Sequence, residues 1–152
     1  MIKKIGIAVL TLALLANGAL AEDAKGVRIE VRVEGIQNTK GEVGVALFNQ
    51  AAGYPTQLQN AFDIKWVSVA DGPKAVDVTF EEVPLGEYAV SVIHDENVNG
   101  MLETGAYGFP EEGVGFSNNQ KVVMGAPSFT ASKFSISKPE PMKMTIQLDY
   151  RK

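Results

Sequence analysis

The chain has 152 residues, with 14 basic and 18 acidic side chains, no cysteine and a formal net charge of −4. This length suits one domain with a core of its own. The lack of cysteine excludes disulfides, thiol chemistry and acylation of a lipoprotein cysteine. The basic residues form no cluster, which argues against nucleic acid as a partner.

The first residues have the layout of a secretory signal peptide. Two lysines precede an almost unbroken apolar stretch, and Ala19-Leu20-Ala21 fits the small-x-small cleavage rule. We expect residues 1–21 to be the signal peptide and 22–152 to be the mature domain, with a formal charge of −6 once both lysines are removed. The apolar stretch is too short to span a bilayer comfortably. The sequence therefore predicts a periplasmic or secreted protein without a membrane anchor after cleavage.

After the signal peptide, apolar residues recur with a period of two, which is typical of strands. Between Val27 and Val33, valine and isoleucine alternate with arginine and glutamate, so this strand has one buried face. Further strands are expected at 43–48, 64–70, 75–80, 88–93, 129–137 and 142–150. With turn signals between them and no helical pattern, these segments predict an all-β fold: a single antiparallel β-sandwich of about seven strands, immunoglobulin-like, with one long loop.

The long loop covers residues 95–127 and is rich in glycine and asparagine. Loops of about thirty residues in a small domain are usually functional or disordered. The aromatic residues at specific places argue against a disordered linker. We expect Tyr107, Phe109 and Phe116 to hold this loop against the sandwich, and the loop to be the functional surface.

The loop opens with the most informative run in the chain, His94-Asp95-Glu96-Asn97-Val98-Asn99-Gly100. Oxygen-bearing side chains at alternate positions, followed by glycine, are typical of a loop that wraps around calcium. An EF-hand is excluded, because Ala106 stands where its last glutamate belongs and a strand precedes the loop. The predicted ligands are the side chains of Asp95, Asn97, Asn99, Glu103 and Glu111, with Glu112 as the alternative to Glu111, and the backbone carbonyl of Met101.

The same run also fits a pair of hydrogen-bonded turns. Asparagine and aspartate cap their own turns through side-chain to backbone bonds, and Asn-Gly is a common turn dipeptide. The sequence leaves both interpretations open. His94 is the only histidine. Without a second imidazole or a cysteine it makes a poor transition-metal site, so we expect it to be packed and hydrogen-bonded.

Other functions compete for this loop. A hydrolase would use Ser117 as nucleophile and His94 as base, but the Gly-x-Ser-x-Gly spacing of a nucleophile elbow is missing. Glycoside chemistry would use Glu111 and Glu112, yet adjacent residues rarely face one cleft. A small-ligand carrier would need an apolar pocket. We expect a binding or structural module rather than an enzyme.

An ordered series of motifs resembles a bacterial family called domain of unknown function 2141. The resemblance covers about residues 27–150 and implies a small exported protein without an assigned activity. It also implies a transthyretin-like β-sandwich, akin to carboxypeptidase regulatory-type domains. The motifs are Pro84-Leu85-Gly86-Glu87-Tyr88, the run from His94 to Gly100, Gly108-Phe109-Pro110-Glu111-Glu112, Gly115-Phe116-Ser117-Asn118-Asn119 and Ala126-Pro127-Ser128-Phe129.

The run from Asp95 to Glu103 also resembles calcium loops in the B repeats of Gram-positive surface adhesins. Asn99 stands where those loops have aspartate, and Glu111 comes later than their usual glutamate. One fewer negative charge implies weaker calcium affinity. The expected protein is thus an envelope module with calcium as its cofactor and an envelope protein or a small ligand as its partner.

Overall fold

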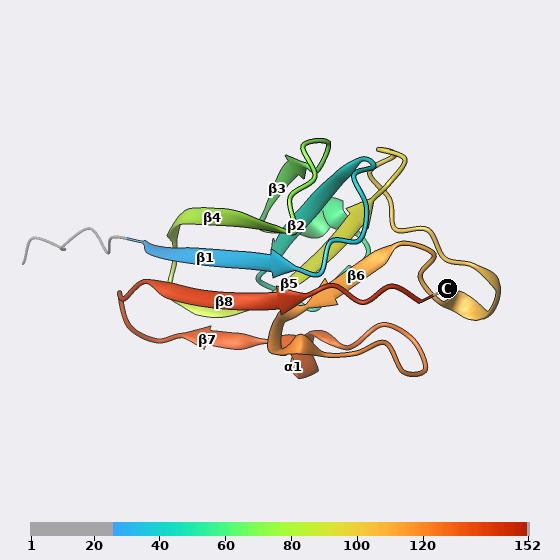
Figure 1. Ribbon diagram of the computed structural model, residues 1–152. Helices are drawn as coiled ribbons and strands as arrows, with labels where there is room; N and C mark the ends of the chain where they lie inside the picture. The colour runs from blue at the N-terminus through green and yellow to red at the C-terminus, as the bar shows by residue number, and fades with distance from the viewer. Residues whose placement is uncertain (1–25, 152) are drawn as a thin grey trace, which may run out of the picture.

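The computed structural model describes residues 26–151, so the predicted signal peptide lies outside the described residues. Two β-sheets form the layers of a sandwich (Figure 1), which confirms the predicted all-β class. Within residues 26–151, no helix is both long and apolar enough to cross a membrane. The strands are β1 (Val27–Glu34), β2 (Glu42–Phe48), β3 (Asp63–Ser68), β4 (Ala75–Val83), β5 (Gly86–Asp95), β6 (Gly113–Phe116), β7 (Phe134–Ile136) and β8 (Met142–Gln147). The only α-helical turn among these residues is α1 (Phe129–Ser132), and the 3-10 turns are η1 (Leu58–Asn60), η2 (Ala106–Gly108) and η3 (Ser117–Asn119).

The topology corrects two details of the prediction. One sheet has the order β4-β1-β8, and the other has the order β3-β2-β5-β6 with β7 also paired to β5. The sandwich is not wholly antiparallel, because β1 and β8 run parallel, with Ile29 opposite Met142 and Val33 opposite Ile146. Strand direction leaves no trace in a period-two pattern. The long loop is also shorter than expected, because β6 lies inside residues 95–127.

A side chain takes the place of a partner strand along the middle of one edge of β5. β2 pairs with most of one edge of β5, whereas the other edge is shared: β7 pairs with its first residues and β6 with its later residues. Neither strand reaches Val90, whose backbone N–H instead donates to Ser117 Oγ at 2.9 Å. The Ser117 hydroxyl in turn donates to the carbonyl oxygen of Ser132 at 2.6 Å. Ser117 therefore satisfies the backbone at a gap between two strands.

Two hydrophobic clusters cover the two faces of the larger sheet. The main core lies between the sheets and includes the inward-facing residues of β1, as their alternation predicted. The smaller cluster, on the outer face, is built from Ile93, Val114, Phe116 and Val122, with Trp66 packed against it. This second cluster explains why β2 is buried on both faces.

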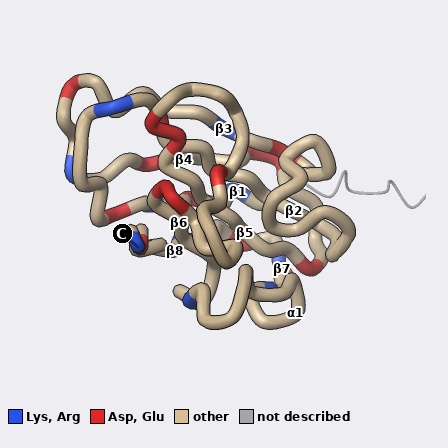
Figure 2. The backbone as a smooth tube through the Cα atoms, turned by 90° about the vertical axis from the view of Figure 1, so that its right-hand side faces the viewer, with Lys and Arg blue, Asp and Glu red and all other residues tan. Residues whose placement is uncertain are grey.

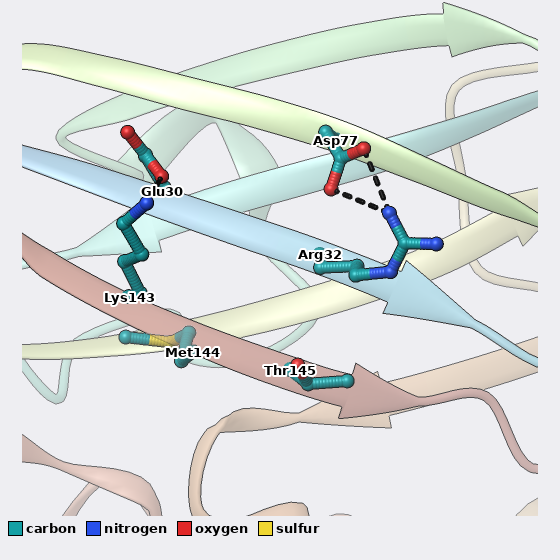
Figure 3. Close-up of a pocket in the computed structure, with 6 residues that line it drawn as sticks. All are labelled: Glu30, Arg32, Asp77, Lys143, Met144 and Thr145. Atoms are coloured by element: carbon teal, nitrogen blue, oxygen red, sulfur yellow. Dashed lines mark hydrogen bonds and ion pairs between the residues drawn. The ribbon is translucent and has the colours of Figure 1, made fainter.

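The outer face of the smaller sheet carries cross-strand ion pairs (Figure 3). Arg32 on β1 donates to both carboxylate oxygens of Asp77 on β4, at 2.9 and 3.1 Å. Lys143 on β8 contacts Glu30 at 2.8 Å. These groups are solvent-exposed, so each pair contributes little to stability. The charged side chains of β1 are therefore paired with opposite charges on β4 and β8.

Candidate functional site

The acidic loop, defined here as residues 95–112, connects β5 to β6 at one end of the sandwich (Figure 1). Figure 2 turns this end toward the viewer and shows several acidic segments on it. The loop contains no lysine or arginine. None of the ion pairs within residues 26–151 involves one of its acids. It therefore gathers negative charge without a paired cation, on the side chains of Asp95, Glu96, Glu103, Glu111 and Glu112.

Asp95 organises the first turn of this loop. Its carboxylate is fully buried and accepts the backbone N–H groups of Asn99 at 3.2 Å and Gly100 at 2.7 Å. Asn97 Oδ1 also accepts from the Asn99 N–H, and Asn99 Oδ1 accepts from the N–H of Met101. These are the bonds of the hydrogen-bonded turns that the sequence offered as one of its two interpretations.

Glu103 closes the turn from the opposite side. Its Oε1 accepts from Asn97 Nδ2 at 2.8 Å and from Asn99 Nδ2 at 2.9 Å. The asparagine oxygens already accept backbone N–H groups, so the amide nitrogens are the atoms that face Glu103. The structure thus brings together three predicted ligands, but with two nitrogens directed at the shared carboxylate. Of the remaining predicted ligands, Met101 has an exposed side chain and Glu111 lies over Gly105.

Glu112 lies at the base of the acidic loop and is only 5 % exposed. Its Oε1 accepts the backbone N–H of Glu96 at 3.0 Å, whereas Oε2 is buried without a hydrogen-bond partner among the described residues. Burial raises the pKa of the Glu112 carboxyl, and nearby Asp95 and Glu103 raise it further. The backbone N–H groups of Glu96 and Glu103 partly offset this rise. These N–H groups therefore compensate the ionised form of Glu112 only in part.

These acids surround a shallow pocket with a volume of about 350 Å³, which we call the acidic pocket. As the side chains stand, no group of three or more His, Asp or Glu residues within 26–151 is placed to hold a metal ion. The pocket brings Asn97, Glu103 and Glu111 of the predicted ligand set onto one surface, together with Glu112, the predicted alternative to Glu111. Its lining residues are Lys40, Glu96, Asn97, Glu103, Glu111 and Glu112.

His94 is fully buried and uses both ring nitrogens in hydrogen bonds. Nε2 lies 2.7 Å from the carbonyl oxygen of Lys40, and Nδ1 lies 2.6 Å from the hydroxyl of Tyr150. A carbonyl only accepts, so Nε2 carries the proton and Tyr150 donates to Nδ1. Burial raises the pKa of Tyr150 to about 12, which keeps the hydroxyl protonated as a donor. The packed, hydrogen-bonded histidine expected from the sequence is confirmed.

The structure does not bring Ser117 and His94 together. Phe116, next to Ser117, lies opposite Ser91, three residues before His94 along β5. At about 3.3 Å per strand residue this separates the two positions by roughly 10 Å. Both side chains make their hydrogen bonds to other groups. The geometry of a serine–histidine hydrolase is therefore not present at these positions.

A protein-family model described as an uncharacterized protein conserved in bacteria (DUF2141) matches residues 31–145. The chain belongs to this family. No curated protein and no solved structure gave a match. The match runs from β1 into β8 and includes the whole acidic loop, so this loop is part of the DUF2141 domain. The family membership expected from the ordered motifs is confirmed.

The aromatic residues of this DUF2141 domain have different roles from one another. Phe116 is 3 % exposed within the smaller cluster, so its predicted role in holding the loop is confirmed. Phe109 is partly exposed, and the guanidinium of Arg151 lies 5.8 Å from its ring centre. The prediction is wrong for Tyr107, which is 95 % exposed. Tyr107 lies in the middle of η2, where its own backbone is left-handed with a φ of +70°.

Val98 is the most strained residue of the acidic loop of the DUF2141 domain. Its φ of +58° is a left-handed value that β-branched residues rarely adopt. We expect Val98→Asn to stabilise the protein by about 1 kcal/mol, because asparagine tolerates this conformation and the valine side chain is exposed. Urea denaturation measures the change. Val123→Asn, at an exposed valine outside the left-handed positions, is the control and should change stability less. Equal effects in both variants would contradict the strain.

Proposed function

We propose that this protein is an exported binding or structural module of the bacterial cell envelope, and that calcium stabilises its acidic loop. The observation that carries the proposal is the gathering of five carboxylates in the loop without an ion pair, two of them buried. Like charges in a desolvated site destabilise one another unless a cation compensates them. Calcium prefers oxygen ligands of this kind.

Export is supported by the signal-peptide layout of residues 1–21. The absence of cysteine is compatible with an oxidising compartment, which permits disulfides without requiring them. The proposal assigns no reaction to the protein. His94 and Ser117, the residues that a hydrolase would use, make hydrogen bonds that satisfy buried backbone and side-chain groups of the fold.

The amount of stabilisation follows from mass action. A ligand that binds only the folded protein stabilises it by about 2.7 kcal/mol at a hundredfold excess over its dissociation constant. Asn99, which replaces the aspartate of related calcium loops, lowers the negative charge at the turn. We therefore expect a response at millimolar rather than micromolar calcium, a range that extracellular sites use.

Thermal melts of the purified mature protein test this function. With millimolar calcium the unfolding midpoint should lie several degrees above its value in EDTA, and magnesium should shift it less because it demands stricter octahedral geometry. Glu103→Gln should reduce the calcium shift. Glu140→Gln, an exposed acid outside the loop, removes the same charge and should leave the shift intact. An unchanged midpoint for the wild-type protein would exclude the calcium role.

A further inference from the structure

The geometry points to a divalent-cation site in the acidic pocket, anchored by Glu112 rather than by the asparagines of the first turn. This inference rests on the proposed calcium role and assigns the atoms that carry it. The calcium loop and the hydrogen-bonded turn, which were alternatives for the run that begins at Asp95, then become compatible. The hydrogen-bonded turn is the scaffold, and the cation binds beside it.

The first observation is the unpartnered oxygen of Glu112. Glu112 is only 5 % exposed, lines the acidic pocket, and has one carboxylate oxygen without a partner among residues 26–151. A buried acceptor left unsatisfied costs about 1–3 kcal/mol, and more when it is charged. Such an atom in a folded protein calls for a bound water or ion.

The second observation is that two neighbouring glutamates accept hydrogen bonds at only one of their two carboxylate oxygens. Glu96 accepts a hydrogen bond from Asn38 at Oε1, and Glu103 accepts both of its hydrogen bonds at Oε1. Within residues 26–151, the Oε2 atoms of these two side chains and the carboxylate of Glu111 accept no hydrogen bond. All of these side chains line the same pocket. Four glutamates that line one pocket thus have carboxylate oxygens that accept no hydrogen bond from the described residues.

The third observation concerns the asparagines, which are poorly placed as ligands. Asn97 Oδ1 and Asn99 Oδ1 each accept a backbone N–H, and their nitrogens donate to Glu103. A nitrogen that carries two hydrogens does not ligate a cation. Binding through the asparagines would break the turn, whereas binding through Glu112 and the free carboxylate oxygens leaves every bond of the turn in place.

The size of the pocket fits a partly hydrated ion. A volume of about 350 Å³ exceeds that of a bare cation. Calcium takes six to eight oxygens and accepts waters among them. Since no three acidic side chains within residues 26–151 are placed to hold an ion as they stand, water completes the shell or the glutamates of the exposed loop rotate inward. Lys40 is the one basic residue in the lining and repels a cation at its rim.

Calcium titrations of three mature proteins test the anchor, with binding followed by calorimetry and by the unfolding midpoint. Glu112→Gln should weaken calcium binding by about tenfold or more, a typical cost for losing a group that supports a metal site. Asn99→Ala should keep wild-type affinity, although its turn is less stable. Glu112→Gln should also unfold in EDTA no earlier than the wild type, because the substitution removes an uncompensated buried charge.

A variant at the pocket rim keeps the test decisive if Glu112→Gln does not fold. Lys40→Gln removes the exposed positive charge but retains the backbone carbonyl that His94 uses, and should tighten calcium binding by about threefold. Wild-type affinity in Glu112→Gln, or unchanged affinity in Lys40→Gln, overturns the anchor while the calcium role stands. No calcium binding by the wild-type protein overturns both.

Discussion

Gly41→Ala is expected to destabilise the protein by about 3 kcal/mol or more, from left-handed strain and steric overlap together. Gly41 precedes β2 and has a φ of +68°. A Cβ atom at this position would lie 1.9 Å from the carbonyl oxygen of Asp95. That oxygen belongs to the backbone and cannot rotate away. The substitution would therefore separate the start of β2 from the end of β5, at the base of the acidic loop.

Gly100→Ala is the matched control for this prediction. Gly100 has nearly the same φ, +72°, but a Cβ there would meet no atom within 4 Å. We expect Gly100→Ala to cost about 1–2 kcal/mol, the price of the left-handed conformation alone. The difference between the two variants in urea denaturation isolates the steric contact with Asp95. Similar losses of stability would show that the backbone accommodates the added methyl group.

His94→Leu is expected to lower the free energy of unfolding by about 2 kcal/mol, because it removes two part-buried hydrogen bonds. The partners in these bonds are the hydroxyl of Tyr150 and the carbonyl of Lys40, which bind the two ring nitrogens of His94. Leucine fills a similar volume, so most of the loss should come from hydrogen bonding rather than from a cavity. Chemical denaturation of the variant measures it.

A double-mutant cycle separates the two bonds of His94. Tyr150→Phe alone removes one hydroxyl and should cost about 1 kcal/mol. In the double variant, the histidine and the hydroxyl are lost together, so the total should be smaller than the sum of the single losses. Strict additivity would mean that the short contact between Nδ1 and the Tyr150 hydroxyl contributes nothing to stability.

Much of the fold could be predicted because apolar and polar residues alternate along most of the strands. β6 could not, since glycine occupies two of its four positions. The structure gives the reason for both glycines. A Cβ on Gly113 would lie 2.4 Å from the ring of Tyr150, and one on Gly115 would lie 2.6 Å from Ile146. Glycine within a strand often marks the close approach of another segment, but the sequence does not show which segment that is.

The sequence predicted the hydrogen-bonded turn of the candidate site, but it did not predict the acidic pocket. The bonds of Asp95 to the following backbone are local, so they follow from the order of residues. The burial of Glu112 beside exposed Glu111 depends on how β6 docks against the rest of the sheet. Non-local packing of this kind decides which of two adjacent glutamates loses its water. No pattern along the chain reports it.

The parallel pair formed by β1 and β8 has a consequence for the order of folding. β1 is the middle strand of its sheet, and its partner β8 comes from the far end of the domain, with Ile29 opposite Met142. Contacts between such distant segments form late, because a long stretch of chain must first be ordered. When the chain emerges N-terminus first, the β4-β1-β8 sheet therefore stays incomplete until β8, its last strand, is available. For a chain that crosses a membrane, the domain would become complete only after β8 has crossed.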